Sequence, residues 1–309
     1  MIITLTPNTG IDHTVQISQF QLNHTIRAST SAWGMGGKAT DVSWILGKLG
    51  VPTRALGFAA GANGARMENM LRERGVETDF VQVAGETRLN TVIVVPGEGQ
   101  STITTSSLEV AADQLADLLT RLETALDQGA SCVVMGGSLP AGVPVDFYTT
   151  AIARAQRQHV PVIFDSSGAS FVAGVKSAPD LIKPNLTELS DLLGYTPGSV
   201  EEIKAAARKV HDEIGSGVIV TLGGEGAIAI FERVSYFIHP VSVPLASSAG
   251  AGDGVLAGMA LALFRRESYE WGLRHGFALA AAVLMTLPTA DLRVEDYQAL
   301  LPQIRIEEL

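Results

Sequence analysis

One short stretch near the C-terminal end of the chain combines a glycine-rich turn with an acidic side chain. Residues 248–254 read Ser-Ala-Gly-Ala-Gly-Asp-Gly, and an apolar, helix-like segment follows at once over residues 255–261. A glycine-rich turn that opens a helix directs backbone N–H groups and the positive end of the helix dipole outward. Such a turn suits a phosphate, or the charge that develops on a phosphoryl group during transfer. The stretch therefore predicts an anion-binding turn over Gly250, Ala251 and Gly252.

Asp253, which follows this turn, allows two interpretations. An Asp at the start of a helix commonly serves as the N-cap and accepts a hydrogen bond from a backbone N–H group. Beside a phosphate-binding turn, the same carboxylate can receive the proton of a hydroxyl group that attacks phosphorus. Phosphoryl transfer depends mainly on positioning and charge stabilisation, so an Asp of ordinary pKa would suffice. Taken alone, the residue favours the cap.

Short apolar runs alternate with helical patterns from about residue 110 onward, at the spacing of β-α-β units. The expected strands cover residues 132–135, 160–164, 181–182, 218–222 and 227–231. The expected helices cover residues 113–127, 145–158, 187–193 and 200–214. Two apolar stretches, 255–264 and 277–287, fall short of the roughly 20 residues that cross a bilayer, so they predict buried helices. The pattern predicts an α/β fold with a mostly parallel sheet and helices on both faces.

The first hundred residues have a different character. Four segments are short, alternating and Thr-rich, as in half-exposed antiparallel strands: 12–17, 25–31, 91–95 and 102–105. Helical segments at about 37–49 and 64–74 lie between them. Because no long linker separates the two parts, we expect a single domain over residues 1–309. Its small β lid would be formed by segments of about 12–31 and 88–106.

The composition argues against several classes of protein. With 309 residues, 46% hydrophobic and 17% charged, the chain can bury a large core. Its net charge of -10 argues against nucleic-acid binding, so an anionic ligand would need a local cluster of cations. The first residues lack the features of a signal peptide, and the six histidines lack metal-ligand spacing. With one cysteine, Cys132, the chain fits a reducing cytoplasm, and we expect no membrane partner.

Eight motifs occur in the order and spacing of one enzyme family. They are Asn8-Thr9-Gly10-Ile11-Asp12, Gly36-Gly37-Lys38, Glu86-Thr87-Arg88-Leu89-Asn90, Gly136-Gly137-Ser138-Leu139-Pro140, Asp165-Ser166-Ser167-Gly168, Lys183-Pro184-Asn185-Leu186-Thr187-Glu188, Thr221-Leu222-Gly223-Gly224-Glu225-Gly226-Ala227 and Gly250-Ala251-Gly252-Asp253. On these motifs the chain resembles the PfkB carbohydrate kinases, which are ribokinase-like. It is most similar to their phosphosugar branch, the 1-phosphofructokinase-like and tagatose-6-phosphate-kinase-like enzymes.

The resemblance implies that Asp253 is the catalytic base and that the amides of Gly250, Ala251 and Gly252 stabilise the transferring phosphoryl group. It implies that the sugar is bound by Asp12, Gly36, Gly37, Asp41 and Asn90. It implies that a substrate phosphate is bound by Arg27, Arg88 and Ser138. Lys38 either joins these contacts or serves only to close the turn in which it lies.

The chain departs from the family pattern at two positions of this site. Asp41 stands where the family usually has an Asn that contacts the sugar. The exchange replaces a hydrogen-bond donor by a second anion, so we expect altered recognition of the sugar hydroxyls. Thr25 stands where the family branch often has a basic residue, so we expect a less basic phosphate pocket.

The resemblance also implies a nucleotide site formed by Lys183, Asn185, Thr221, Gly223 and Gly226. In the family, the pair Asn185 and Glu188 organises Mg²⁺ and its waters, and such a donor set suits an ion that keeps much of its hydration shell. Pro184 indicates that a helix starts here, which would place both side chains on one face. The same spacing fits a capping box, so that interpretation stays open.

The expected activity is ATP- and Mg²⁺-dependent phosphorylation of a ketohexose phosphate: fructose 1-phosphate, tagatose 6-phosphate or fructose 6-phosphate. Two alternatives are a kinase of an unphosphorylated sugar or nucleoside and a catalytically inactive phosphosugar-binding protein. A nicotinamide-binding fold is disfavoured, because no Gly-x-Gly-x-x-Gly follows the first strand. Exposed lid strands would favour a homodimer.

Overall fold

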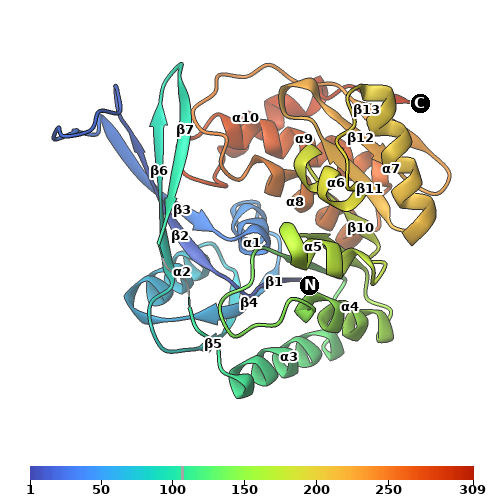
Figure 1. Ribbon diagram of the computed structural model, residues 1–309, viewed down its shortest axis with the longest axis horizontal. Coiled ribbons are helices and arrows are strands. Elements are labelled where there is room, and N and C mark those ends of the chain that lie inside the picture. Colours follow the sequence, from blue (N-terminus) through green and yellow to red (C-terminus); the bar gives the residue numbers. More distant parts are fainter. Residues whose placement is uncertain (106–107) are drawn as a thin grey trace.

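The computed structural model describes residues 1–105 and 108–309 (Figure 1). The main sheet contains β1 (Ile2–Thr6), β4 (Thr53–Ala59), β5 (Glu77–Gln82), β8 (Cys132–Gly136), β9 (Val162–Asp165), β10 (Leu181–Ile182), β11 (Gly217–Thr221), β12 (Ala227–Ile230), β13 (Ser235–Ile238) and β14 (Ile306–Glu308). Their order is β14-β13-β12-β11-β10-β9-β8-β1-β4-β5. Neighbours from β11 to β5 are parallel, and β12 to β14 extend the sheet antiparallel.

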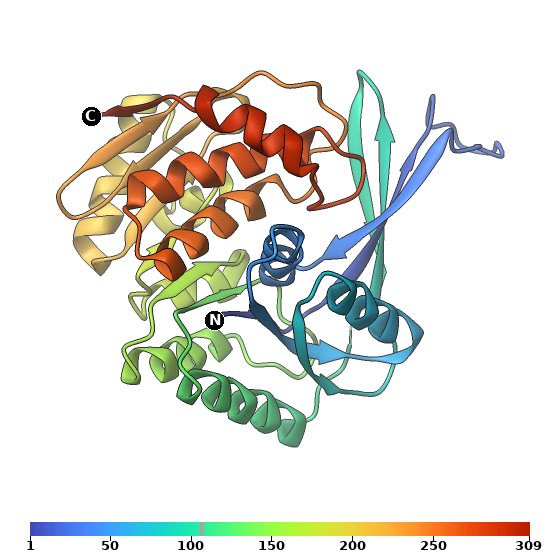
Figure 2. The ribbon, with the colours of Figure 1, turned by 180° about the vertical axis from the view of Figure 1, so that it is seen from behind.

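Helices cover both faces of this sheet. One layer, toward the viewer in Figure 1, contains α3 (Ala112–Asp127), α4 (Phe147–Arg157), α5 (Gly168–Val175), α6 (Leu186–Leu193) and α7 (Val200–Ile214). The other layer, toward the viewer in Figure 2, contains α1 (Lys38–Lys48), α2 (Gly61–Glu73), α8 (Ala251–Arg265), α9 (Tyr269–Leu284) and α10 (Val294–Leu300). Short 3-10 helices lie at Gly223–Glu225 and Leu301–Gln303.

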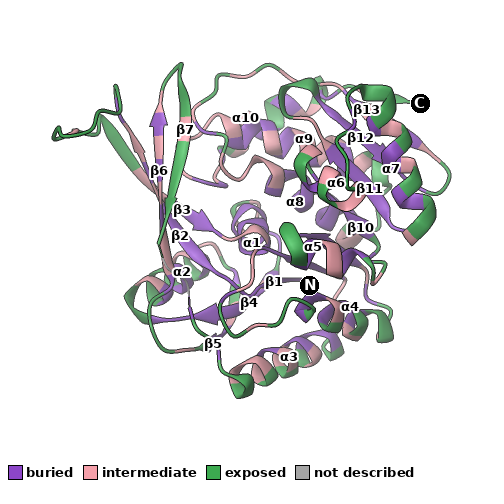
Figure 3. Cartoon of the chain, in the orientation of Figure 1, coloured by how far each residue is buried: buried purple, intermediate pink, exposed green. Residues whose placement is uncertain are grey.

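The parallel strands are apolar throughout because each of their faces is covered. In β1, Ile2 belongs to the core cluster under α1 and α8, whereas Ile3 and Leu5 belong to the cluster under α3 and α4. Successive side chains of a strand point to opposite faces, which produces this division. Figure 3 shows the buried strands between two partly exposed helix layers.

A separate small sheet projects from the main sheet (Figure 1). It contains β2 (Gly10–Gln16), β3 (Thr30–Gly36), β6 (Arg88–Val95) and β7 (Gly99–Thr104), in the order β3-β2-β6-β7. The predicted strand at 25–31 was wrong, since the chain pairs only from Thr30 onward. The expectation of antiparallel lid strands holds for the pairs β2–β3 and β6–β7, but it was wrong for β2 and β6, which are parallel. Parallel strands need a long crossover connection. Between β2 and β6 this connection includes β4 and β5 of the main sheet.

The predicted fold class, a mostly parallel sheet with helices on both faces and a small β sheet beside it, is confirmed. The predicted strands and helices after residue 110 are also confirmed, with small shifts at their ends except for α9, which begins at Tyr269 and not near residue 277. The sequence reading missed that β1, β4 and β5 join the main sheet, and it missed α5. Ser106, the last residue of the second predicted lid segment, lies outside the described residues. None of the helices described is both long and apolar enough to cross a membrane.

Candidate active site

Five motif residues, among them the predicted site residues Ser138, Lys183 and Thr221, lie where parallel strands end. Asn8 follows β1, Ser138 follows β8, Asp165 ends β9, Lys183 follows β10 and Thr221 ends β11. Because these strands run in one direction, their C-terminal ends meet along one edge of the sheet, where open α/β sheets bind their ligands.

The glycine-rich turn brings the N-terminus of α8 to this edge. Gly250 is the N-cap and has a φ of 83°, in the left-handed region that favours glycine. A Cβ atom at Gly250 would also collide with the backbone of Ala290. Asp253 is therefore the third residue of the helix, and its own N–H donates to the carbonyl of Gly250 at 3.1 Å. The interpretation of Asp253 as the N-cap was wrong.

Asp253 does not have the ordinary pKa that the sequence suggested. Its side chain is buried, and burial together with the charge of Asp165 raises its pKa to about 7. The ammonium groups of Lys38 and Lys183 act in the opposite direction. A carboxylate whose pKa lies near neutrality is a better proton acceptor than an ordinary Asp at the same pH.

Asp165 holds two lysines beside this carboxylate. Its side chain is 1% exposed, it lies 3.0 Å from the Nζ atom of Lys183, and it accepts a hydrogen bond from Lys38. Burial acts to raise the pKa of Asp165, but the charges of Lys183 and Lys38 hold it below its ordinary value. Lys38 also donates to Glu188 at 3.2 Å, so it lies beside the residues predicted to bind the nucleotide and not with Arg88. Asp165 belongs to one of the eight sequence motifs, but no role was predicted for the residue.

On the lid side, Asp12 and Asn90, both predicted to bind the sugar, lie together. They lie opposite each other on the parallel strands β2 and β6, and the Nδ2 atom of Asn90 donates to Oδ1 of Asp12 at 2.7 Å. A Cβ atom at Gly36 would collide with that Asp12 oxygen, which explains the glycine. Gly37 has a φ of 117° and leads into α1. Burial raises the pKa of Asp12.

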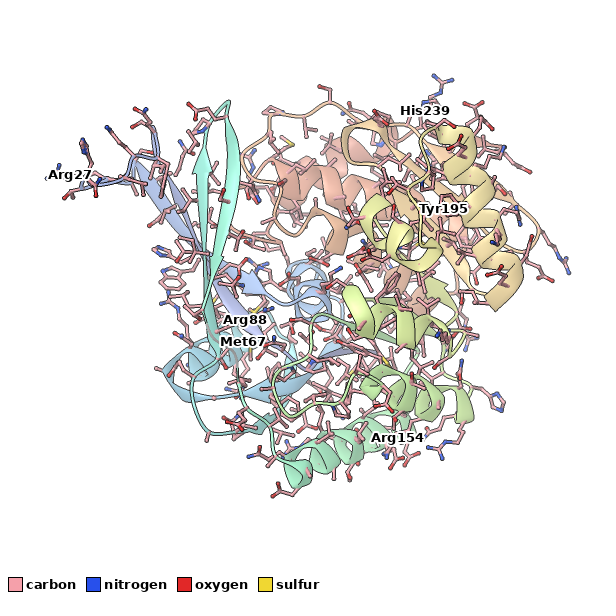
Figure 4. The ribbon with its side chains drawn as sticks, in the orientation of Figure 1. Arg27, Met67, Arg88, Arg154, Tyr195 and His239 are labelled. Carbon is pink, nitrogen blue, oxygen red and sulfur yellow. The ribbon has the colours of Figure 1, made fainter. Side chains whose placement is uncertain are left out.

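The structure separates the residues that were expected to bind a substrate phosphate. Arg88 begins β6, near Asp12 and Asp41, and its Nε atom is buried without a hydrogen-bond partner among the described residues. Ser138 accepts a hydrogen bond from the Nδ2 atom of Asn8 at 2.9 Å. Arg27 is exposed at the far tip of the loop between β2 and β3, well away from Arg88 (Figure 4). A single chain therefore does not bring Arg27 to the other predicted phosphate contacts.

Asn185 and Glu188 form the capping box that the sequence left open. The Oδ1 atom of Asn185 accepts from the N–H of Glu188, and Oε2 of Glu188 accepts from the N–H of Asn185, both at 2.9 Å. Lys38 donates a hydrogen bond to Oε1, the other carboxylate oxygen of Glu188. Each oxygen can accept one further hydrogen bond. The pair thus fits Mg²⁺ held through its water shell better than direct ligation.

Thr221, Gly223 and Gly226 surround the turn between β11 and β12. Thr221 pairs with Asn185 in an isolated bridge, which joins the two halves of the predicted nucleotide site. A Cβ atom at Gly223 would meet no neighbouring atom, whereas one at Gly226 would collide with the carbonyl of Ile238. The turn therefore requires glycine at position 226. The loop containing Thr289 and Ala290 packs on Gly34 and Gly250, and no site residue was predicted in it.

The twisted, mostly parallel sheet, its two helix layers and the small β lid define the ribokinase-like class of kinases. Residues 7–292 match the model of the pfkB family of carbohydrate kinases, and the chain belongs to this family. Over the whole of both chains it is 31% identical to a 1-phosphofructokinase from Bacillus subtilis (strain 168). It is also 31% identical, over the whole of both chains, to a tagatose-6-phosphate kinase from Staphylococcus epidermidis (strain ATCC 12228 / FDA PCI 1200).

Two solved structures have the same architecture over nearly the whole chain. Phosphofructokinase-2 from Escherichia coli, in complex with substrates and products, matches with a TM-score of 0.88 and 27% identity, covering 98% of both chains. A possible 1-phosphofructokinase from Thermotoga maritima matches with a TM-score of 0.89 and 25% identity, covering 100% of this chain and 99% of the other. The predicted phosphosugar branch of the family is confirmed, and the chain is a carbohydrate kinase.

Proposed function

We propose that this kinase transfers the γ-phosphoryl group of ATP to a hydroxyl group of a ketohexose phosphate, with Asp253 as the proton acceptor. The observation that carries the proposal is the position of Asp253, which lies in the first turn of α8 and faces Lys38 and Lys183. Base, helix N-terminus and two cations thus converge on one point, as phosphoryl transfer requires. The names of the relatives favour fructose 1-phosphate, tagatose 6-phosphate or fructose 6-phosphate as the acceptor.

In this reaction the substrate oxygen forms its bond to the γ-phosphorus, the bond to the departing ADP oxygen breaks, and the hydroxyl proton passes to Asp253. The first-turn amides of Ala251 and Gly252, which helix geometry leaves without intrahelical partners, point toward the transferring group. The ammonium groups of Lys38 and Lys183 stabilise the charge that develops there. Asn185 and Glu188 would hold the waters of Mg²⁺, which when bound neutralises negative charge on the nucleotide phosphates.

An assay that couples ADP release to a detectable product tests the proposal with a panel of ketohexose 1- and 6-phosphates. We expect at least one of them to be phosphorylated. Asp253→Asn, which cannot accept the proton, should lower kcat by about 100- to 10,000-fold. Asp191→Asn, a change at an exposed position of α6, is the matched control and should leave kcat unchanged. Turnover of none of the phosphosugars, or near-normal turnover by Asp253→Asn, would contradict the proposal.

A kinase of an unphosphorylated sugar is the second candidate, and one observation favours it. Within a single chain Arg27 lies away from the site, and Arg88 faces the carboxyl groups of Asp12 and Asp41. The same assay separates the two functions when free ketohexoses join the panel. If a phosphate is bound, Arg88→Ala lowers kcat/KM for the phosphosugar far more than for the free sugar. Equal effects would favour the second candidate.

A further inference from the structure

Two acidic residues meet in the site although they are distant in the sequence. Asp41 lies in the first turn of α1 and Asp253 in the first turn of α8, and these helices pack against each other. Asp41 is 4% exposed and Asp253 is 8% exposed. Their carboxyl groups lie within hydrogen-bonding reach. Because an ionised carboxylate only accepts hydrogen bonds, one of the two groups must carry a proton for this contact to form.

The surrounding charges decide which group carries it. Lys38 and Lys183 both act on Asp253, and Asp165 is the other charged group that faces it. Asp41 instead faces the acids Asp12 and Asp253, with Arg88 as the cation that acts on it. The charged groups around the pair are thus Asp12, Lys38, Arg88, Asp165 and Lys183. The cations stabilise the anionic form of Asp253 better than that of Asp41, so the proton belongs on Asp41.

We propose that Asp41 is a neutral carboxylic acid that donates a hydrogen bond to the carboxylate of Asp253 and thereby positions the catalytic base. This inference rests on the proposed function, in which Asp253 accepts the substrate proton. Burial and the charges of Asp253 and Asp12 raise the pKa of Asp41 well above its ordinary value, in agreement with the assignment. From the sequence we expected a second anion at this position, but a protonated Asp41 keeps the donor that an Asn would supply.

The arrangement has two consequences for the reaction. A hydrogen bond from Asp41 stabilises the ionised form of Asp253 and orients it toward the substrate hydroxyl. The Oδ1 atom of Asp41 is buried and has no hydrogen-bond partner among the described residues, so it remains available to accept from a sugar hydroxyl. When Asp41 loses its proton at high pH, the donor disappears and a second anion stands beside the base. Activity should therefore fall on the alkaline side because of Asp41.

Infrared difference spectroscopy of the protein without substrates tests the protonation directly. At about pH 8.5 Asp253, whose pKa is about 7, is ionised. The wild-type spectrum should then still contain the carbonyl band of a protonated carboxylic acid, and Asp41→Asn should lack this band. Glu68→Gln is the matched control, because Glu68 is also a buried acid but lies on α2 among Arg72 and Gln82. This control should retain the band. A band that persists in Asp41→Asn would overturn the proposal.

Steady-state kinetics against pH tests the positioning role. Asp41→Asn, which keeps a neutral donor, should have a higher kcat/KM near neutral pH than Asp41→Ala and should lose the alkaline decline of the wild type. Asp41→Ala, which removes the donor, should lower kcat/KM by about 10- to 100-fold and move the acid limb to higher pH. If Asp41 is an anion in the wild type, Asp41→Asn will instead move the acid limb to lower pH, and the proposal is wrong.

The two experiments separate this inference from the proposed function. The infrared band reports the proton of Asp41 whether or not the added phosphosugars are substrates. Failure of the proposed function would appear as absent turnover in the wild type. Failure of the inference would appear as an unchanged band in Asp41→Asn, or as equal kinetics for Asp41→Asn and Asp41→Ala.

Discussion

The burial of Asp253 raises its pKa. The raised pKa suits a proton acceptor, but it lowers the stability of the folded protein. The group is removed from water, and its neighbours include the acids Asp41 and Asp165 as well as two lysines. In the unfolded chain the same carboxyl has a pKa near its ordinary value of 3.8. Its rise to about 7 means that folding disfavours the charged form, which is the form that the proposed proton transfer needs.

The sign of this shift predicts how Asp253→Asn changes stability with pH. Between the unfolded value of 3.8 and the folded value of about 7, the folded protein binds more protons than the unfolded chain. Because of this group, the free energy of unfolding therefore falls as pH rises through that window, by up to about 1.4 kcal/mol for each pH unit. Asn carries no charge, so Asp253→Asn should gain stability over the wild type between pH 4 and 7 and hold that gain at higher pH.

Urea unfolding of the substrate-free protein at about pH 5 and pH 8 measures this difference. The advantage of Asp253→Asn should be larger at pH 8, whereas the exposed-site variant Asp191→Asn should follow the wild type at both values. Equal stabilities of Asp253→Asn and the wild type at pH 8 would show that Asp253 is not destabilised by burial.

At the scale of the element, α8 reaches the site because small residues let it approach α9 closely. A Cβ atom at Gly258 would collide with the backbone of Gly276, and one at Gly254 would come within 2.6 Å of the backbone nitrogen of Ala280. Glycine therefore permits backbone contact along this seam at some loss of intrinsic helix propensity. The position of the N-terminus of α8, and of Asp253 with it, depends on this packing.

Gly258→Ala should therefore destabilise the protein by about 1–3 kcal/mol, because the added methyl group overpacks the seam between α8 and α9. Gly198→Ala is the control. Gly198 is exposed, and a Cβ atom there would make an ordinary contact of 3.5 Å with Glu202, so its stability should change by less than about 0.5 kcal/mol. Urea unfolding of both variants measures the difference. A Gly258→Ala protein as stable as Gly198→Ala would show that the helices can separate without loss.

For the molecule as a whole, the lid is a surface that exposes both apolar side chains and strand edges. Large apolar side chains are exposed on it: Phe20 at 54%, Leu22 at 75% and Ile103 at 56%. Its outer strands β3 and β7 are edge strands, which offer unpaired backbone groups to another chain. These features favour a homodimer that forms through the lid. Because Arg27 lies at the tip of the lid, its place relative to a substrate depends on what packs there.

Light scattering at micromolar concentration should give the mass of a dimer for the wild type, and Leu22→Lys should lower that mass toward the monomer. The introduced charge would stand in the apolar contact and oppose its burial. Tyr195→Lys is the control, since Tyr195 is 53% exposed but lies on the opposite side of the molecule (Figure 4). A wild-type monomer, or a dimer that both variants retain, would speak against association through the lid.

The sequence predicted much of the fold because strands and helices have their own periodicities. Local patterns predict the parallel strands that are buried on both faces, the helices between them and the turn at Gly250. The first hundred residues were harder to interpret. They alternate between two sheets, and a strand such as β4 does not reveal which sheet it joins. That choice is made by long-range pairing, which no local pattern records.

Local sequence patterns were enough to identify the groups available for chemistry: the glycine-rich turn, the acid that follows it and the capping pair Asn185 and Glu188. Their local geometry follows from positions only a few residues apart. The tertiary structure alone decided that Asp41 meets Asp253, that Asp165 binds both Lys38 and Lys183, and that Arg27 stands apart from Arg88. Charge interactions and burial depend on distance through space. The protonation states of Asp41 and Asp253 are therefore set only after folding has brought together residues that are far apart in the chain.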